Sequence, residues 1–450
     1  MTSILFLAAS LYAASVDLNT AAQNNDLTGA AKLIHEGANV KATNRYGVTP
    51  LAIACTNGNA AMIELLLNSG ADANTTLPGG ETALMTAART GRLDAVKVLL
   101  AKGANPNSKE AKRGQTALMW AAAEGHAEVV EALITAGADF RSRLSSGYTP
   151  FFFAVREGRP TVVAALLKAG VDVNETFQLA EGATRANNAP RVGSSALHLA
   201  VGNAHYELAA QLLEAGANPN ADGNGLTALH VITGIRKPGG GDNDPAPSGS
   251  GAMTSIEMVR KLKAKGANLN ARMTKRINVG LTALNTLGAT PFFLAARSAD
   301  YELMSELASL GADPLIPNAD GSTPLIAAAG LGTRSPGEDA GTESEVVEAM
   351  KVALDLGNNI DAVDKNGETA MHGAAYKNYG EAVKLLARRG ANVEIWNKKN
   401  KAGWTPLAIA LGYRFGNFKP SPPTIDALRE VMKAAGASEA ETIKKSKSDY

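Results

Sequence analysis

The side chains that could act in catalysis or bind a metal are few and widely spaced in this sequence. The 450 residues contain six histidines and a single cysteine, Cys55, so no disulfide can form within the chain and a thiolate zinc site is not expected. Asp242, Asn243 and Asp244 could ligate a hard cation, but their spacing is not that of a calcium loop, and no glutamate follows at the required distance. The sequence therefore predicts no metal site.

Familiar catalytic and nucleotide-binding patterns are also missing. No CxxCH, GxSxG or GxxxxGK[ST] run occurs, and GLGTRSPG at Gly330 departs from the dinucleotide pattern because Ser335 stands at the third glycine position. A separate enzymatic domain would need roughly 100 residues, whereas the largest insertion described below has about 30. We expect the protein not to be an enzyme and to bind no cofactor. An enzyme with its site inside the insertions is the alternative.

The elements that must position any site follow from a glycine-led run that recurs along the chain. It reads GVTPLAIA at Gly47, GETALMTA at Gly80, GQTALMWA at Gly114 and GYTPFFFA at Gly147, at intervals of 33, 34 and 33 residues, and further copies extend to Gly403. A unit this short cannot bury a closed core alone, so it must stack on neighbours that share its apolar face. The repeats therefore predict a solenoid whose function lies on a continuous surface.

Each repeat contains the signals of two helices and a turn. The Thr-Pro or Thr-Ala pair begins the first helix, because threonine caps free amide groups and proline suits the first helical position. Runs such as AMIELLLNSG and DAVKVLLAKG have apolar residues at helical spacing and end at a glycine, while connectors such as ANPNSKE favour tight turns. The terminating glycines indicate eleven repeats and are Gly37, Gly70, Gly103, Gly137, Gly170, Gly216, Gly266, Gly311, Gly357, Gly390 and Gly436.

The combined pattern, GxTPLHxAA followed by a Gly-His turn and VVxLLLxxGADxNA, resembles the ankyrin-repeat signature over residues 17–437. The resemblance implies an all-α ankyrin-repeat solenoid of about eleven helix-turn-helix units with β-hairpin fingers. It also implies that His198, His230 and His372 hydrogen-bond to a neighbouring repeat instead of binding a metal. Cys55 occupies a position where the other repeats have alanine or another small residue, so we expect it to be buried.

The ends of the array differ from its interior. Residues 17–46 lack the Thr-Pro-Leu start and are polar, as expected of an N-terminal cap unit, and residues 403–437 supply the C-terminal unit. The tail, residues 438–450, is too polar to pack, and we expect it to be mobile.

Residues 1–15, MTSILFLAASLYAAS, form a candidate signal peptide. The stretch is too short to span a bilayer, and Ala13 and Ser15 are the small residues of a cleavage site, although the usual positive leading segment is missing. A frayed terminal helix is the alternative.

The regular spacing breaks in the later repeats. Gly147 to Gly193 is 46 residues, Gly225 to Gly288 is 63, and Gly321 to Gly367 is 46. Additions in repeat proteins form loops on one face, often the binding face, so we expect these loops to shape a recognition groove. Tolerated surface drift is the alternative, because long loops cost little stability. The insertions are residues 177–192 and 273–287 in fingers, and residues 236–251, 332–345 and 414–423 between the helices of one repeat.

The predicted function is protein recognition on the concave surface made by fingers and first helices. Lys and Arg number 44 against 43 Asp and Glu, so the net charge of +1 gives no reason to expect a nucleic-acid partner. Aromatic residues and arginine most often supply binding energy at protein interfaces. The repeat register selects Tyr46, Arg89, Trp120, Tyr148, Arg156, Arg297, Tyr376 and Trp404 as candidate contacts. We expect a monomer without a membrane span.

The same features predict where in or outside the cell the protein is found. A cleaved signal, one cysteine and no membrane span favour a periplasmic or secreted protein, whereas a cytoplasmic effector or adaptor is the alternative. The runs GATPFFLAARSADYELM, DPLIPNADGSTPLIAAAGLG and PGEDAGTE resemble a subgroup of exported bacterial ankyrin proteins, some of them joined to c-type cytochrome modules. No haem motif is present in this sequence.

Overall fold

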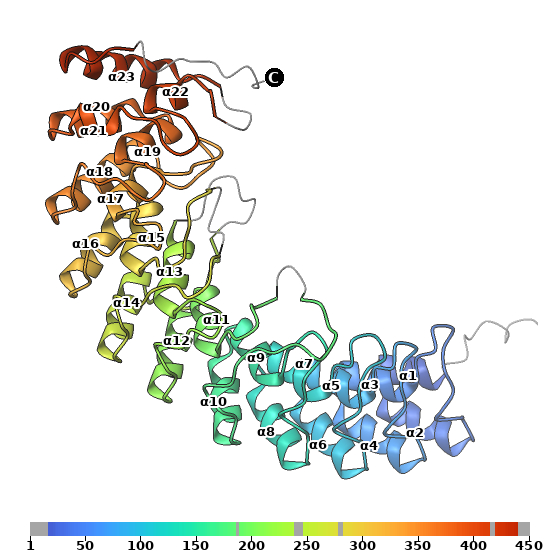
Figure 1. Ribbon diagram of the computed structural model, residues 1–450. Coiled ribbons are helices and arrows are strands. Elements are labelled where there is room, and N and C mark those ends of the chain that lie inside the picture. The colour runs from blue at the N-terminus through green and yellow to red at the C-terminus, as the bar shows by residue number, and fades with distance from the viewer. Residues whose placement is uncertain (1–16, 186–188, 238–245, 278–281, 415–418, 440–450) are drawn as a thin grey trace, which may run out of the picture. The chain divides into compact units, whose positions relative to one another are not determined.

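A computed structural model describes residues 17–185, 189–237, 246–277, 282–414 and 419–439. The candidate signal peptide and most of the polar tail lie outside these residues. The chain divides into two compact blocks, Met1–Ala189 and Pro190–Tyr450. In both blocks the described residues form helices that follow one another as stacked pairs (Figure 1).

The N-terminal block contains five helix pairs among its described residues. They are α1 (Leu18–Gln23) with α2 (Leu27–His35), α3 (Pro50–Asn57) with α4 (Ala60–Asn68), α5 (Ala83–Arg89) with α6 (Leu93–Ala101), α7 (Ala117–Glu124) with α8 (Ala127–Thr135), and α9 (Pro150–Arg156) with α10 (Pro160–Lys168). These pairs are repeats 1 to 5.

The C-terminal block contains six further pairs in the part of the chain that the structure describes. They are α11 (Ala196–Gly202) with α12 (Tyr206–Glu214), α13 (Ala228–Arg236) with α14 (Ser255–Ala264), α15 (Pro291–Arg297) with α16 (Tyr301–Ser309), α17 (Pro324–Ala328) with α18 (Glu343–Asp355), α19 (Ala370–Lys377) with α20 (Gly380–Arg388), and α22 (Pro406–Ala410) with α23 (Pro422–Ala434). A short helix, α21 (Val393–Trp396), lies between the last two pairs. The eleven predicted repeats are confirmed.

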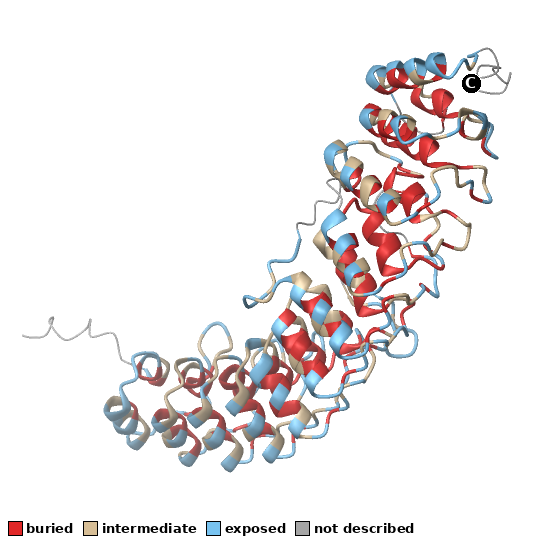
Figure 2. Ribbon diagram, turned by 90° about the vertical axis from the view of Figure 1, so that its left-hand side faces the viewer, coloured by how far each residue is buried: buried red, intermediate tan, exposed pale blue. Residues whose placement is uncertain are grey.

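The two helices of a repeat are buried to different extents. All seven residues of the first helix α15 are buried, whereas the second helix α20 buries one apolar stripe that includes Val383 and Leu386 and leaves its other side in solvent. Figure 2 shows this contrast as a largely red row of first helices and second helices with pale blue outer faces. Each first helix therefore belongs to a core that neighbouring repeats share. Burial of each large apolar side chain in this core stabilises the fold by about 1.5–3 kcal/mol.

Threonine caps and positive-φ glycines set the boundaries of the first helices. Thr49 Oγ1 accepts a hydrogen bond from the amide of Ala52 at 3.2 Å, and Pro50 occupies the first helical turn. Gly147, which opens one recurring run, has φ 95°, and a Cβ there would lie 2.6 Å from the carbonyl oxygen of Gln178. Only glycine fits this combination of backbone angle and close approach.

Asparagines tie one repeat to the next along the outer turns. The Nδ2 of Asn74 donates to the carbonyl of Gly103 at 3.0 Å, and its Oδ1 accepts from the amide of Asn105 at 2.8 Å. Asn107 and Asn220 make the same two bonds to the repeats that follow them. The connector asparagines thus satisfy helix-end carbonyls between repeats, in addition to favouring turns.

The fingers, which connect the second helix of one repeat to the first helix of the next, are tight turns. Leu144 N donates to Tyr148 O at 2.9 Å, and Asn400 N donates to Trp404 O at the same distance. In the described residues the only strand pairings are isolated bridges, one of them between Thr282 and Thr333. Because the described residues contain isolated bridges and no ladder, the expected β-hairpins are hairpin-shaped turns.

The insertion between α17 and α18 contacts each of its neighbouring insertions. Thr333 bridges to Thr282 in the enlarged finger of the preceding repeat, and its carbonyl accepts from Arg414 Nη1 at 3.1 Å. At its other end, Glu345 forms an ion pair with Lys237, which follows α13. Described residues of the insertions expected at 273–287, 332–345 and 414–423 therefore meet within the C-terminal block. Residues 186–188, 238–245, 278–281 and 415–418 of the expected insertions lie outside the described residues.

A buried ionic cluster anchors this insertion and corrects one sequence prediction. Arg297, expected on the binding surface, is only 7% exposed and forms an ion pair with Asp339. Lys377, which is fully buried, lies 3.7 Å from the other Asp339 oxygen and donates to the carbonyl of Ala340. Burial lowers the pKa of Lys377 to about 8. Arg297 is covered because the insertion folds over the end of its helix.

Removing the charge at Asp339 should destabilise the C-terminal block. Asp339→Asn leaves two buried cations without their carboxylate, which typically costs about 3–5 kcal/mol. Urea denaturation followed by circular dichroism measures the loss. Asp355→Asn, which removes an exposed partner of Arg389 at 2.8 Å, should cost below about 1 kcal/mol. Equal effects of the two variants would contradict a structural role for the cluster.

Candidate functional site

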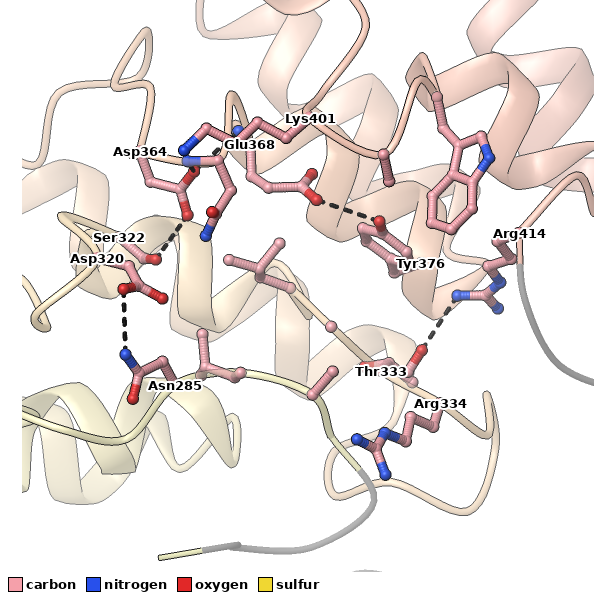
Figure 3. Close-up of a pocket in the computed structure, with 17 residues that line it drawn as sticks. Asn285, Asp320, Ser322, Thr333, Arg334, Asp364, Glu368, Tyr376, Lys401 and Arg414 are labelled. Carbon is pink, nitrogen blue, oxygen red and sulfur yellow. Dashed lines mark hydrogen bonds between the residues drawn. The ribbon is translucent and has the colours of Figure 1, made fainter. Parts of the chain in front are cut away.

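A cavity of about 540 Å³ opens on the finger side of the C-terminal block (Figure 3). Two finger turns contribute carboxylates to its wall, the next finger contributes Trp404, and the enlarged finger contributes Ala283 to Asn285. The first residues of the insertion after α17 close the opposite side. The side chain of Tyr376, late in the first helix α19, also lines the cavity. The cavity thus lies where the sequence predicted a binding surface.

Two of the carboxylates hold the finger turns together. Asp364 Oδ2 accepts from the Ser322 hydroxyl at 2.8 Å, and its Oδ1 accepts from the amides of Asn366 and Glu368 at 2.7 and 3.0 Å. Asp320 Oδ1 accepts from Asn285 Nδ2 at 3.1 Å, which joins two fingers. These contacts give both carboxylates a structural role.

Glu368 is the carboxylate whose hydrogen bonds are incomplete. It is 8% exposed, and Figure 3 shows its carboxyl group directed into the cavity towards Tyr376. Oε1 accepts from the Tyr376 hydroxyl at 3.1 Å and from Asn400 Nδ2 at 2.8 Å. Oε2 is buried and has no hydrogen-bond partner among the described residues. Burial raises the pKa of Glu368 to about 7, and the nearby charge of Asp364 adds to the rise.

The opposite wall of the cavity carries positive charge. The guanidinium of Arg414 lies 5.3 Å from the centre of the Tyr376 ring and donates to the Thr333 carbonyl. Burial lowers the pKa of Arg414 to about 10, so the group remains a cation at neutral pH. Arg334 is exposed beside it. The cavity therefore has Glu368 and Arg414 on opposite sides of the Tyr376 ring.

The structure brings some candidate residues of the N-terminal block into contact with each other. Arg89 lies over the Trp120 ring at 4.6 Å, and Arg156 lies over the rings of Tyr148 and Phe153 at 4.8 and 5.1 Å. Both are cation–π contacts on first helices. The sequence selected these residues one at a time, and the structure places them in contact as pairs.

The exposure of the candidate residues varies widely. Tyr148 is 7% exposed and packs against Phe177 at a centroid distance of 5.3 Å, so it belongs to the core that anchors the first enlarged finger. Tyr46 is 65% exposed and stands beside Arg45. Tyr376 is 8% exposed at the cavity, while Trp404 is half-buried at its edge. The exposed fraction therefore distinguishes candidate residues that the sequence selected by the same criterion.

The histidines behave as the resemblance implied. His230 Nε2 donates to the carbonyl of Ala289 in the next repeat at 3.1 Å, and its Nδ1 accepts from the Thr227 hydroxyl at 2.8 Å. His198 and His372 make equivalent pairs of bonds. Burial lowers the pKa of His230 and of His372 to about 4. These imidazole rings are therefore uncharged at neutral pH and join adjacent repeats by hydrogen bonds.

The remaining chemical groups give no metal or redox site within the described part of the chain. No group of three or more His, Cys, Asp or Glu side chains there is arranged to hold a metal ion. Cys55 is buried as expected, and burial raises the pKa of its thiol to about 12. Of the helices that the structure describes, none is both long enough and apolar enough for a membrane span.

Comparison with known families agrees with this architecture. A model described as ankyrin repeats in three copies matches residues 18–110, 105–177 and 340–419, which together make up more than half of the chain. A single-copy ankyrin-repeat model matches residues 192–224. The chain belongs to the ankyrin-repeat family.

Curated relatives share part of the array. The chain is 34% identical over 233 residues to neurogenic locus notch homolog protein 1 of Xenopus tropicalis, 52% of this chain and 6% of that protein. It is 30% identical over 229 residues to the protein of the same name from Danio rerio, 51% of this chain and 6% of the relative. The chain thus spans only a small part of the length of the curated relatives it matches.

The raised pKa of Glu368 predicts a pH-dependent stability. Because the folded pKa of about 7 exceeds its ordinary value of 4.5, folding favours the protonated form, and that contribution is lost as the pH rises from 4.5 through 7. The unfolding free energy of the wild type should therefore fall relative to Glu368→Gln, by at most about 1.4 kcal/mol per pH unit. Urea titrations of both proteins between pH 4.5 and 8 measure the difference. Parallel profiles would contradict the assignment, and exposed Glu348→Gln is the control.

Some residues that line the cavity are predicted from their position in the repeat, and the others are identified only by the structure. Tyr376 and Trp404 were predicted, and Arg414 falls in a predicted insertion. Glu368 was missed. A usable signal was present, because a glutamate directly before the capping threonine stands at the cavity-facing edge of a finger.

Proposed function

We propose that this chain is a non-enzymatic protein-interaction scaffold whose partner binds the surface of finger turns and first helices. Ankyrin repeats are generally protein–protein interaction modules. The observation that carries the proposal for this chain is the cavity of about 540 Å³, because four successive fingers and a first helix contribute to it. A half-buried aromatic residue at the edge of a cavity is typical of an interface anchor.

The insertions support the same surface. Ala283 to Asn285 from the enlarged finger, Leu331 to Arg334 from the next insertion and Arg414 from the last one all line the cavity. Loops that met by neutral drift would have no reason to line one common cavity. In the N-terminal block, the Arg89–Trp120 and Arg156–Phe153 pairs offer a second area of contact.

One observation favours the enzymatic alternative. A carboxyl group with a pKa near 7 in a cleft is a common feature of general acids and bases. Glu368 is, however, bonded to Tyr376 and Asn400, neither of which is an activated nucleophile. The proposal therefore assigns the carboxyl group to recognition.

Export and a monomeric state complete the proposal. The apolar stretch at residues 1–15 and the single cysteine support a periplasmic or secreted protein, and a cytoplasmic adaptor is the alternative. Mass spectrometry of the mature protein should show an N-terminus near residue 16. Retention of Met1 in the mature protein would favour the cytoplasmic alternative.

The assigned surface can be tested by changes at its edge that leave the core intact. Trp404→Ala with Lys401→Ala removes an aromatic face and an exposed charge beside the cavity. Capture of partners from an extract of the source cells should fall at least tenfold, with unchanged circular dichroism. Tyr301→Ala removes an aromatic residue, 42% exposed, from the second helix α16, and is the matched control. Equal capture by the double variant and the control would assign binding to another face.

A further inference from the structure

We propose that the cavity beside Glu368 receives a positively charged side chain, arginine or lysine, supplied by the bound protein. The inference rests on the proposed function and specifies the chemistry of the partner. It depends on the incomplete bonding of Glu368 and on a second repeat of the same chain, where an equivalent glutamate has a cationic partner.

The incomplete bonding of Glu368 defines the position of the occupant. Tyr376 and Asn400 both donate to Oε1, while Oε2 is buried without a partner among the described residues. A buried carboxylate oxygen in this state lowers stability unless a donor reaches it. Because Figure 3 shows the carboxyl group facing the cavity, the donor can come from a molecule that enters there.

Repeat 3 shows which group this register accepts. Glu81 directly precedes the capping Thr82, as Glu368 precedes Thr369. Seven residues after the threonine, repeat 3 has Arg89, whose Nη2 lies 3.4 Å from Glu81 Oε1. In repeat 3 the glutamate therefore has a guanidinium partner from its own first helix.

Repeat 10 has an uncharged residue at the position of that arginine. The residue seven positions after Thr369 is Tyr376, which donates one hydrogen bond to Glu368 and carries no charge at neutral pH. The two register positions also meet in repeat 5, where Arg156 lies over Tyr148 at 4.8 Å. The contact between these positions is thus a property of the repeat, and the tyrosine leaves a carboxylate whose charge the repeat does not neutralise.

Aromatic groups complete the comparison. In the N-terminal block, the guanidinium that pairs with Glu81 also lies over the ring of Trp120 at 4.6 Å. Around Glu368, the aromatic rings of Tyr376 and Trp404 both line the cavity. A cation beside Glu368 would find a carboxylate and ring faces, the combination that binds Arg89.

The other charged groups around the cavity are compatible with a cation at this point. Asp364 is the charged neighbour that acts on Glu368, and its negative charge favours a cation there. Lys401 and Arg334 are exposed, so solvent screens their repulsion. Arg414 is held on the opposite wall by the Thr333 carbonyl and the face of Tyr376. The cation is therefore expected on the finger side, beside Asp364 and Glu368.

The experiment uses the full chain and labelled octapeptide pools. One central position is fixed as Arg, Lys, citrulline, norleucine or Glu, and the other seven positions are randomised. Fluorescence anisotropy at pH 8 should show the Arg and Lys pools binding at least tenfold more tightly than the citrulline and norleucine pools. Glu368→Gln should abolish this preference, while exposed Glu348→Gln should retain it. Lowering the pH from 8 to 6 should reduce the preference about tenfold, because Glu368 becomes protonated.

The remaining outcomes separate this inference from the proposed function. Equal binding of all pools would overturn the inference and leave the scaffold function in place, and tightest binding of the Glu pool would assign the cavity to an anionic side chain instead. A second arm measures n-butylguanidinium by tryptophan fluorescence. Glu368-dependent binding of this small cation without any peptide binding would overturn a protein source. Failure of every pool and of the small cation would overturn the inference, while the Trp404 capture experiment independently decides the scaffold function.

Discussion

The structure depends on the burial of each first helix between its neighbours. A helix such as α15, with all seven residues buried, cannot exist on the surface of an isolated repeat, so each repeat is stable only when the next one covers it. This requirement explains the short units, the abundance of alanine in the first helices and the amphipathic second helices. It also places the side chains that are free to recognise a partner on the fingers and on the exposed ends of the first helices.

Shared burial has a second consequence, because every seam between repeats also encloses polar backbone groups. His230 and Asn74 meet this need with side chains that reach a carbonyl of the next repeat. The insertion after α17 folds over the end of α15. A buried ionic cluster of Arg297, Asp339 and Lys377 holds the insertion there. Polar side chains in this solenoid therefore join adjacent repeats and hold the insertion in place.

The candidate site lies where two repeats differ in the partner of the glutamate that precedes the capping threonine. In repeat 3 the glutamate before the cap and the arginine late in the helix neutralise each other, whereas repeat 10 pairs Glu368 with Tyr376. Burial raises the pKa of this carboxyl group to about 7, and the inserted segments line the same cavity. A small departure from the repeat pattern, enclosed by loops, turns a structural position into a candidate recognition site.

The sequence by itself determined the eleven repeats, the helix boundaries at Thr-Pro pairs and the locations of the insertions, because these follow from periodicity and local capping. It also selected Tyr376 and Trp404 by register. The hydrogen bonds of the histidines between repeats were implied by the resemblance to ankyrin repeats. Only the tertiary structure showed that Arg297 and Tyr148 are buried, since the residues that cover them, Asp339 and Phe177, come from insertions outside the repeat pattern. The role of Glu368 likewise depends on contacts with Tyr376 and Asn400. Exposure and charge compensation are set by neighbours distant in the chain, and a repeat pattern does not encode them.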